Sequence, residues 1–286
     1  MILRQASLSE LSCILDWAAD EGWNPGRDDA AAFHASDPDG FFVAEIDGQI
    51  MAAISVVNHD ATLAFLGLYL CCPAYRGQGI GFALWSHALA HAGTRTVGLD
   101  GVADQQDNYA RSGFVRTGAT ARYEGSLAAL EAGPDKAEAG SEDLRACRDA
   151  DTEAVAALDL AANGFARPAF LSVWCRDAAD RKTTLLWRDG AVAGMATARL
   201  CRDGSKIGPL VAPDQAGALA LVGAAARSVG ATQLIVDVPE TQPGFQAALD
   251  AHGFVSGFAT ARMYRGAPPR PAAPATLWGV ATLELG

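Results

Sequence analysis

Arg76-Gly77-Gln78-Gly79-Ile80-Gly81 is the stretch that decides the fold of this chain. It follows an uncharged run from Ala61 to Tyr75 and opens an apolar segment that begins at Phe82. A loop with one arginine, three glycines and no acidic residue, placed before a helix, presents free backbone N–H groups and a positive dipole end to an anion. The stretch therefore predicts a cradle for the pyrophosphate of a phosphorylated cofactor.

Two other nucleotide-binding loops fit the sequence less well. A Rossmann loop would place a ribose-binding acid about 20 residues on, where Asp100 lies, but Phe82 replaces the third glycine of that fingerprint. A Walker loop needs a Lys-Ser/Thr pair after its glycines, and none follows here. The sequence therefore argues against both a Rossmann loop and a Walker loop at this position.

Length and composition bound the class of protein. The 286 residues favour about two domains, and a hydrophobic content of 50% argues against disorder. The longest uncharged run contains Pro73 and is too short to span a bilayer of about 30 Å. The first residues lack the basic start and apolar core of a signal peptide, so we expect a cytoplasmic protein that does not contact membranes.

Charge and cysteine content restrict the partners. The net charge of −11 lies mainly in the first half and disfavours nucleic acid, which needs a basic face. A small molecule, and a cationic one in particular, suits the acidic half as an acceptor. The six cysteines show no metal-ligand spacing, and we expect them to be reduced.

The sequence repeats itself on either side of residues 129–142, a small, charged stretch that reads as a linker. Gly113-Phe114-Val115 precedes Ala119-Thr120-Ala121-Arg122, and Gly253-Phe254-Val255 precedes Ala259-Thr260-Ala261-Arg262 at the same spacing. The offset between the two copies is 140 residues. Leu3-Arg4 also matches Leu144-Arg145 at an offset of 141, and Asp47-Gly48 matches Asp189-Gly190 at 142. Three matches at a near-constant offset indicate duplication.

Each half alternates elements in the same order. A helix over 9–20 is expected with Ser9 as its N-cap, and two strands over 41–46 and 50–57 are joined at Asp47-Gly48, a strong hairpin signal. The remaining elements expected in the first half are a strand over 62–72, a helix to about residue 91, a strand over 96–101, a helix over 104–111 and a strand over 114–123. Antiparallel hairpins that feed one β-loop-α-β unit predict an α+β fold, with two tandem domains that each hold a mixed, mostly antiparallel sheet flanked by helices.

With these motifs the first half resembles the GNAT superfamily of N-acetyltransferases, whose signature is R/Q-x-x-G-x-G/A after a central strand. Arg76, Gly79 and Gly81 fill that signature, and the run from Tyr109 to Phe114 matches the family's Y-x-x-x-G-F. The chain is similar to a bacterial tandem subgroup with a degenerate second domain. The resemblance implies domains at 1–128 and 143–266, followed at 267–286 by a Pro-rich spacer and a C-terminal strand.

The resemblance also implies acetyl-CoA as the co-substrate and no metal. The cofactor-binding residues are then Arg76 to Phe82, together with Tyr69, Leu70 and Cys71 on the preceding strand. If that strand splays from the strand over 96–101, pantetheine can pair along it, and a backbone N–H near Leu70 or Cys71 can polarise the thioester carbonyl.

Proton transfer needs an acid and a base. Tyr109 occupies the position of the family's general acid and can protonate the departing thiolate. For the base that deprotonates the amine, the sequence leaves Glu21, Asp100, Glu45 and His59 open, with Glu21 preferred because it lies in the segment that corresponds to the acceptor-side loop.

Two further pairs have competing interpretations. His87 and His91 are four residues apart on one helix but lack a third ligand, so a packed or solvated pair is favoured over a metal site. Cys71 and Cys72 suggest a covalent acyl-enzyme, but a cysteine at a strand end is usually a small buried hydrophobe.

The second half lacks the chemical groups of the first. The offset of 140 places Arg76 on Ala216, Gly79 on Leu219 and Tyr109 on Leu249. The second half is therefore expected to shape the acceptor site, to mediate assembly such as a homodimer, or to be structural. The tail over 276–283 reads as a strand that adds to a sheet edge.

The sequence thus predicts an N-acetyltransferase that moves an acetyl group from acetyl-CoA to an amine of a small molecule by direct attack in a ternary complex. The alternative is a non-catalytic acyl-CoA-binding sensor or scaffold. The acceptor is not identified by the sequence.

Overall fold

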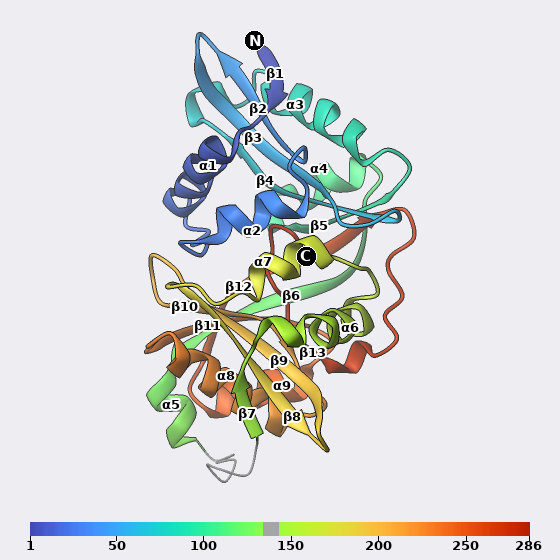
Figure 1. Ribbon diagram of the computed structural model, residues 1–286. Helices are drawn as coiled ribbons and strands as arrows, with labels where there is room; N and C mark the ends of the chain where they lie inside the picture. The colour runs from blue at the N-terminus through green and yellow to red at the C-terminus, as the bar shows by residue number, and fades with distance from the viewer. Residues whose placement is uncertain (134–142) are drawn as a thin grey trace.

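The computed structural model describes residues 1–133 and 143–286, and it contains two halves with the same order of elements (Figure 1). The elements of the first half are β1 (Ile2–Gln5), α1 (Leu8–Asp20), α2 (Asp29–Ser36), β2 (Phe41–Ile46), β3 (Gln49–Asn58), β4 (Leu63–Cys71), α3 (Ile80–Leu89), β5 (Thr96–Gly101), α4 (Gln106–Arg111), β6 (Val115–Ser126) and α5 (Leu127–Ala132). Those of the second half are β7 (Asp143–Ala146), α6 (Thr152–Asn163), α7 (Pro168–Trp174), β8 (Arg181–Arg188), β9 (Ala191–Leu200), β10 (Ser205–Val211), α8 (Gln215–Ser228), β11 (Gln233–Pro239), α9 (Pro243–Ala251), β12 (Val255–Arg265) and β13 (Leu277–Gly279).

The α+β prediction is confirmed, and the expected elements of the first half are found with shifts of a few residues at their ends. The linker expected at 129–142 lies mostly outside the described residues, and α5 covers its beginning. None of the helices in the described parts of the chain is long and apolar enough to cross a bilayer.

Both hairpins form for the reason that the sequence indicates. Asp47 and Gly48 have φ angles of 52° and 77°, and Asp189 and Gly190 repeat these values in the second half. Two consecutive left-handed residues match the twist of the flanking strands, which is why Asp-Gly is favoured there. The duplication is therefore visible in the backbone as well as in the sequence.

The first helix begins earlier than predicted. Ser7, not Ser9, is the N-cap of α1, because its hydroxyl accepts the Glu10 N–H at 3.3 Å. The Glu10 carboxylate in turn accepts the Ser7 N–H at 2.8 Å, which completes a capping box. The glutamate three residues after Ser7 was the signal that distinguishes the two serines.

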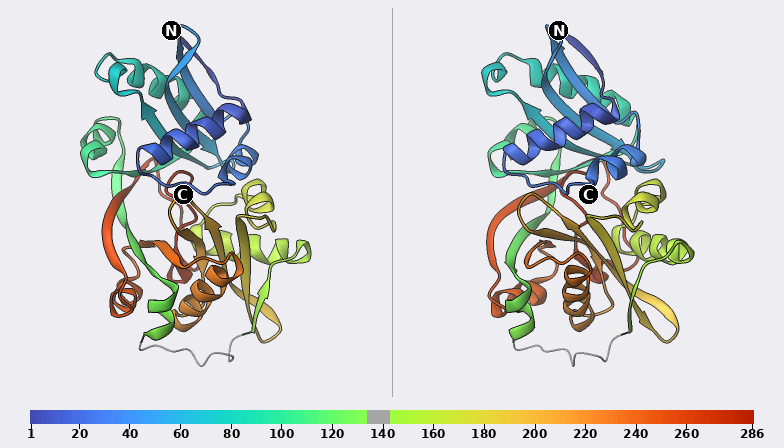
Figure 2. Two further views of the ribbon diagram at one scale, coloured as in Figure 1. Left: turned by 90° about the vertical axis from the view of Figure 1, so that its left-hand side faces the viewer. Right: turned by 60° about the vertical axis from the view of Figure 1, so that its left-hand side comes forward.

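All the described strands but β13 form one continuous path in a single sheet, in the order β1-β2-β3-β4-β5-β12-β6-β11-β10-β9-β8-β7. Each half therefore places its last long strand in the part of the sheet built by the other half: β12 pairs with β5, and β6 pairs with β11. Figure 2 shows β6, in green, descending into the second half while β12, in orange-red, rises toward the first. Within the described residues, the parallel neighbours are β4 with β5 and β10 with β11, so the sheet is mostly antiparallel.

The two halves also share a hydrophobic core. One buried cluster combines side chains of α1 and α2 with side chains of α7, β8 and β9. At its centre the rings of Phe33 on α2 and Trp174 on α7 stack, with their centroids 6.2 Å apart. Two further cores lie around α3 and around α8, and each includes side chains of the strand that comes from the other half.

The tail beyond β12 does not extend an outer edge of the sheet, as the sequence suggested. Only Leu277–Gly279 is a strand, and it pairs antiparallel with β10 in the interior of the sheet. The residues after it run between the halves, where the last residue lies (Figure 1).

Candidate active site

Strands β4 and β5 separate in the middle of the first half. Their parallel pairing runs from Leu63 with Thr96 to Leu66 with Leu99, and β4 then continues to Cys71 without β5 beside it. Leu68 has a φ angle of +47°, and the pairing of β4 with β3 shifts register around it. A bulge of this kind bends a strand away from its neighbour, so the splayed arrangement expected from the sequence is present.

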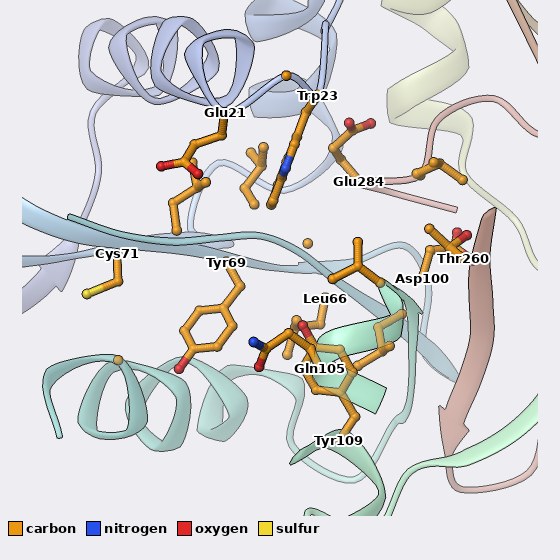
Figure 3. A pocket seen from close by; sticks show the side chains of 18 of the residues that line it. Glu21, Trp23, Leu66, Tyr69, Cys71, Asp100, Gln105, Tyr109, Thr260 and Glu284 are labelled. Carbon is orange, nitrogen blue, oxygen red and sulfur yellow. The ribbon is translucent and has the colours of Figure 1, made fainter. Parts of the chain in front are cut away.

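A cavity of about 880 Å³ occupies the gap between these strands (Figure 3). Most of the site residues named from the sequence line it: Glu21, Tyr69, Leu70, Cys71, Arg76, Gly77, Gly79, Gly81, Phe82, Asp100 and Tyr109. Two members of the cradle do not. The side-chain amide of Gln78 donates to the Ala74 carbonyl at 2.8 Å, and Ile80 is buried in the core.

The glycine loop is built as an anion cradle requires. Gly77 and Gly79 have φ angles of 75° and 82°, which favour glycine, and Gly79 is the N-cap of α3. The first N–H groups of α3 have no acceptor within the helix, as at every helix N-terminus. A Cβ at Gly81 would lie 2.7 Å from the Tyr69 hydroxyl, so a larger residue here would have to displace the end of that side chain.

Arg76 is held beside the cradle by two contacts. Its Nε donates to the Cys71 carbonyl at 2.9 Å, and its Nη2 lies 3.0 Å from Oε1 of Glu21. The side chains remain 54% and 32% exposed, so the ion pair is open to solvent and to competition by another anion. The preferred base candidate and the cradle cation are thus neighbours.

The second base candidate, Asp100, is paired in a different way. Both of its carboxylate oxygens accept hydrogen bonds from Arg262 on β12, each at 2.8 Å. Arg122 on β6 makes the same bidentate contact with Asp237 on β11, at 2.8 and 3.0 Å. Asp100 therefore has a clear structural role, which connects the first half to the strand it receives from the second.

The other two base candidates lie elsewhere. Glu45 accepts a hydrogen bond from Arg4 at 2.8 Å, on β1. His59 donates from Nε2 to the carbonyl of Leu285 at 2.7 Å. Neither residue lines the cavity, so neither can reach an acceptor bound in it.

The acid candidate has the surroundings that keep a phenol protonated. Tyr109 is 9% exposed, and its ring stacks on Trp85 with centroids 5.5 Å apart. Burial, and after it the neighbouring Tyr69, raise the pKa of Tyr109 to about 12. Tyr69 also lines the cavity, and its hydroxyl is a second possible proton donor that the sequence did not single out.

Several lining residues were missed because they come from the second half or from the exchanged strands. They are Arg122, Glu124, Phe258, Thr260, Leu283 and Glu284. The tail passes so close to β4 that a Cβ at Gly67 would collide with the backbone oxygen of Glu284. The repeated Ala-Thr-Ala-Arg was used only as a sign of duplication, and no local pattern pointed to residues 283 and 284.

The loop that carries Glu21 and Trp23 is fastened to the second half. The Lys206 ammonium donates to the Trp23 carbonyl at 2.9 Å, and the Asn24 amide donates to the Asp203 carbonyl at 2.7 Å. Arg27 donates to the Cys201 carbonyl at 3.0 Å. The second half thus determines where this wall of the cavity lies.

The histidine and cysteine pairs range from half-buried to exposed. His91 contacts Asp37 at 2.7 Å and His87 packs edge-on against Phe42, and no cluster of potential metal ligands is found in the described residues. Burial raises the pKa of the Cys71 thiol, which makes it a poorer nucleophile.

The second half contains the same splay, but its gap is filled. Strands β10 and β11 pair in parallel as far as Ile207 with Val236 and then part. Strand β13 enters this gap and pairs with β10 at Leu210 and Val211. The Trp278 indole N–H donates to the Ala212 carbonyl at 2.8 Å and anchors the strand there.

The filled positions correspond to the open ones of the first half. At the repeat offset of 140, Leu210 and Val211 correspond to Leu70 and Cys71, the two residues whose backbone N–H groups are expected to polarise the thioester carbonyl. The helix end nearby is also occupied, because Asp214 caps α8 by accepting the Gly217 N–H at 2.8 Å. The second cleft therefore offers neither a free strand edge nor a free cradle.

Comparison with known proteins places both halves in one family. Residues 8–114 match the acetyltransferase (GNAT) family, and residues 155–279 match an acetyltransferase (GNAT) domain. The chain is 33% identical over 284 residues to a protein of Pseudoalteromonas sp. described as holothin acyltransferase, a match that covers 99% of this chain and 94% of that protein.

Solved structures share the complete fold. A putative acetyltransferase from Pyrococcus horikoshii superposes with a TM-score of 0.78 at 21% identity, over 100% of this chain and 95% of that one. A tandem GNAT protein from the clavulanic acid biosynthesis pathway superposes with a TM-score of 0.64 at 19% identity, over 94% and 99% of the two chains. At these identities the likeness concerns the fold.

Proposed function

Because the chain belongs to the GNAT acetyltransferase family and is an acyltransferase of that type, we propose that its first half transfers an acetyl group from acetyl-CoA to an amine of a small molecule. The observation that carries this proposal is that the glycine cradle, the open edge of β4 and the Tyr109 phenol all line one cavity. They are the parts that diphosphate binding, pantetheine pairing and thiolate protonation require.

The described residues fit acetyl-CoA in a defined order along this cavity. The N-terminus of α3 and Arg76 bind the diphosphate, because both present positive charge or N–H donors to it. Beyond Leu66 the edge of β4 no longer pairs with β5, so it is open for pantetheine. A backbone N–H of Leu70 or Cys71 polarises the acyl carbonyl.

Proton transfers accompany the direct attack of the amine. A C–N bond forms to the acyl carbon and the C–S bond breaks, while Tyr109 gives its phenolic proton to the departing sulfur. Glu21 accepts the proton of the amine, directly or through a water, since it lies on the side of the cavity opposite Tyr109 (Figure 3). The Arg76 guanidinium stabilises negative charge nearby: that of the Glu21 carboxylate, with which it pairs in this structure, or that of the bound diphosphate.

A titration and a screen test the proposal. Calorimetric titration with acetyl-CoA should show binding, and thiol release should then be detected over a panel of small amines. The panel should include holothin, because the relative from Pseudoalteromonas sp. is described as holothin acyltransferase. Binding of acetyl-CoA without thiol release on any amine would instead favour the acyl-CoA sensor.

A further inference from the structure

One hydroxyl in the cavity has no hydrogen-bond partner among the residues that the structure describes. Thr260, in the middle of β12, is 3% exposed, and its Oγ1 is buried without a hydrogen bond. Nearly all buried polar groups in folded proteins are hydrogen-bonded, and an orphan is costly to maintain. Because Thr260 lines the cavity, a molecule bound there can supply the missing partner.

One buried carboxylate in the same cavity has no ion pair within the described residues. Glu284 is 5% exposed, and the hydrogen bonds of its side chain go to Thr282, two residues earlier. The buried carboxylates nearby each pair with an arginine: Asp29 with Arg199, Asp100 with Arg262, and Asp237 with Arg122. The neighbouring cation Lys206 donates to the Trp23 carbonyl instead of to Glu284.

Both groups lie on the side of the cavity away from the phenol. Thr260 and Arg262 share a face of β12, and Arg262 contacts Asp100 on the same face of β5. Alternate residues of these strands, such as Met263 and Leu99, instead join the core that contains Tyr109. Figure 3 shows Glu284 beside Trp23, opposite Tyr109, with Thr260 at the right-hand end of the cavity.

We infer that Thr260 and Glu284 form a polar subsite for a second hydrogen-bond-donating group of the acceptor. The preferred acceptors are then bifunctional: one amine is acylated, and a distant ammonium, hydroxyl or amide N–H binds this subsite. Trp23 supplies an apolar wall for the hydrocarbon between the two groups. The inference rests on the proposed function of the first half, and it assigns acceptor selection to residues of the second half.

Direct binding tests this without turnover. We would titrate the protein, saturated with CoA, with a homologous series of diamines and amino alcohols, and with alkylamines of the same number of heavy atoms. The bifunctional compounds should bind at least about 10-fold more tightly, as expected for one charge-assisted hydrogen bond gained. Equal affinities throughout the series, or no binding by any member, would overturn the inference.

Two variants and one matched control locate the effect. Thr260→Val should weaken the bifunctional compounds about 3- to 10-fold and Glu284→Gln about 10-fold or more, with alkylamines unchanged. Ser55→Ala removes another orphaned buried hydroxyl, on β3 and outside the cavity, and should change neither. Thr260→Val should also leave the melting temperature unchanged or raise it, since it removes an unsatisfied group; a marked fall would reveal a purely structural role.

The binding and catalytic readouts separate the two proposals. If bifunctional amines bind selectively but release no thiol from acetyl-CoA, the proposed function fails and the subsite stands. If thiol is released with no preference for bifunctional amines and no response to Thr260→Val or Glu284→Gln, the function stands and the subsite fails.

Discussion

Thr120 and Thr260 lie directly opposite each other, as Cα partners of the antiparallel pair β6 and β12. Their numbers differ by 140, the offset of the sequence repeat, so each is the counterpart of the other. The pseudo-two-fold axis of the duplication therefore passes between them. The two copies of Ala-Thr-Ala-Arg lie on the strands that pair across this axis, β6 and β12. The arginine of each copy extends away from the axis: Arg122 contacts Asp237, and Arg262 contacts Asp100.

The symmetric ion pairs predict matched losses of stability. Asp100→Asn and Asp237→Asn should each lower the free energy of unfolding by about 3–5 kcal/mol, because each removes the counter-ion of an arginine that is mostly shielded from water, Arg262 and Arg122 respectively. Chemical denaturation measures both. We expect kcat per folded molecule to stay similar in the two variants; a 100-fold larger loss in Asp100→Asn would assign the base to Asp100 rather than Glu21.

Charge in the cradle should abolish cofactor binding. Gly79→Glu places a carboxylate at the N-terminus of α3, and we expect acetyl-CoA affinity to fall by at least about 100-fold in calorimetry. Gly230→Glu is the matched control, because Gly230 also has a positive φ and open space around it but lies after α8. Both variants should lose about 1–2 kcal/mol of stability from backbone strain. Unchanged affinity in Gly79→Glu would remove the cradle assignment.

Tyr109→Phe should separate chemistry from binding. The loss of the phenolic proton should lower kcat by about 10²–10⁴-fold, while acetyl-CoA affinity changes little because the ring still stacks on Trp85. Since the pKa of Tyr109 is raised to about 12, the acid stays protonated and the rate should not fall through its ionisation below about pH 11. Tyr69→Phe is the companion variant, and a larger loss there would transfer the acid role to Tyr69.

The filled second cleft predicts one acetyl-CoA per chain. Calorimetry should give a stoichiometry of one, because β13 occupies the edge of β10 that corresponds to the open edge of β4. Trp278→Ala should cost about 3–5 kcal/mol of stability without raising that number, since the Asp214 carboxylate already caps the N-terminus of α8 and would repel a diphosphate there. Two bound molecules per chain would contradict this.

Acid should loosen the contact between the β3–β4 loop and the tail. Burial, followed by the charge of Arg167, lowers the pKa of His59 to about 4, while its Nε2–H donates to Leu285. The unfolded chain binds a proton near pH 6.5 that the folded chain resists, so stability should fall by about 1–3 kcal/mol as the pH drops from 6.5 to 4. Denaturation of wild type and His59→Asn over that range should show a steeper loss in wild type; parallel curves would exclude His59 as the cause.

The sequence predicted the features that depend on neighbours in the chain. The Asp47-Gly48 hairpin, the glycine loop before α3 and the helical spacing of α1 are local patterns, and each is found where it was expected. The cavity that gathers Glu21, Arg76, Asp100 and Tyr109 followed from the family resemblance. The roles of these residues stay predictions.

The exchange of β6 and β12 between the halves could not be predicted from the sequence, for a physical reason. The two strands carry the same Ala-Thr-Ala-Arg motif, so hydrophobic pattern and β propensity fit either strand equally well into either half. Glu284 was missed because its contact with Gly67 joins residues far apart in sequence, and a glutamate in a tail carries no sign of burial. Such contacts are decided by the packing of the halves.

Strand exchange also determines when the first half can complete its sheet during translation. Strand β5 leaves the ribosome with a bare edge, and its partner β12 begins about 150 residues later, a delay of about 8–30 s at ordinary elongation rates. During that interval the nascent first half exposes the kind of unpaired strand edge that invites aggregation. The first half, in which we propose the active site, therefore becomes complete only when almost the whole of the second half has been translated.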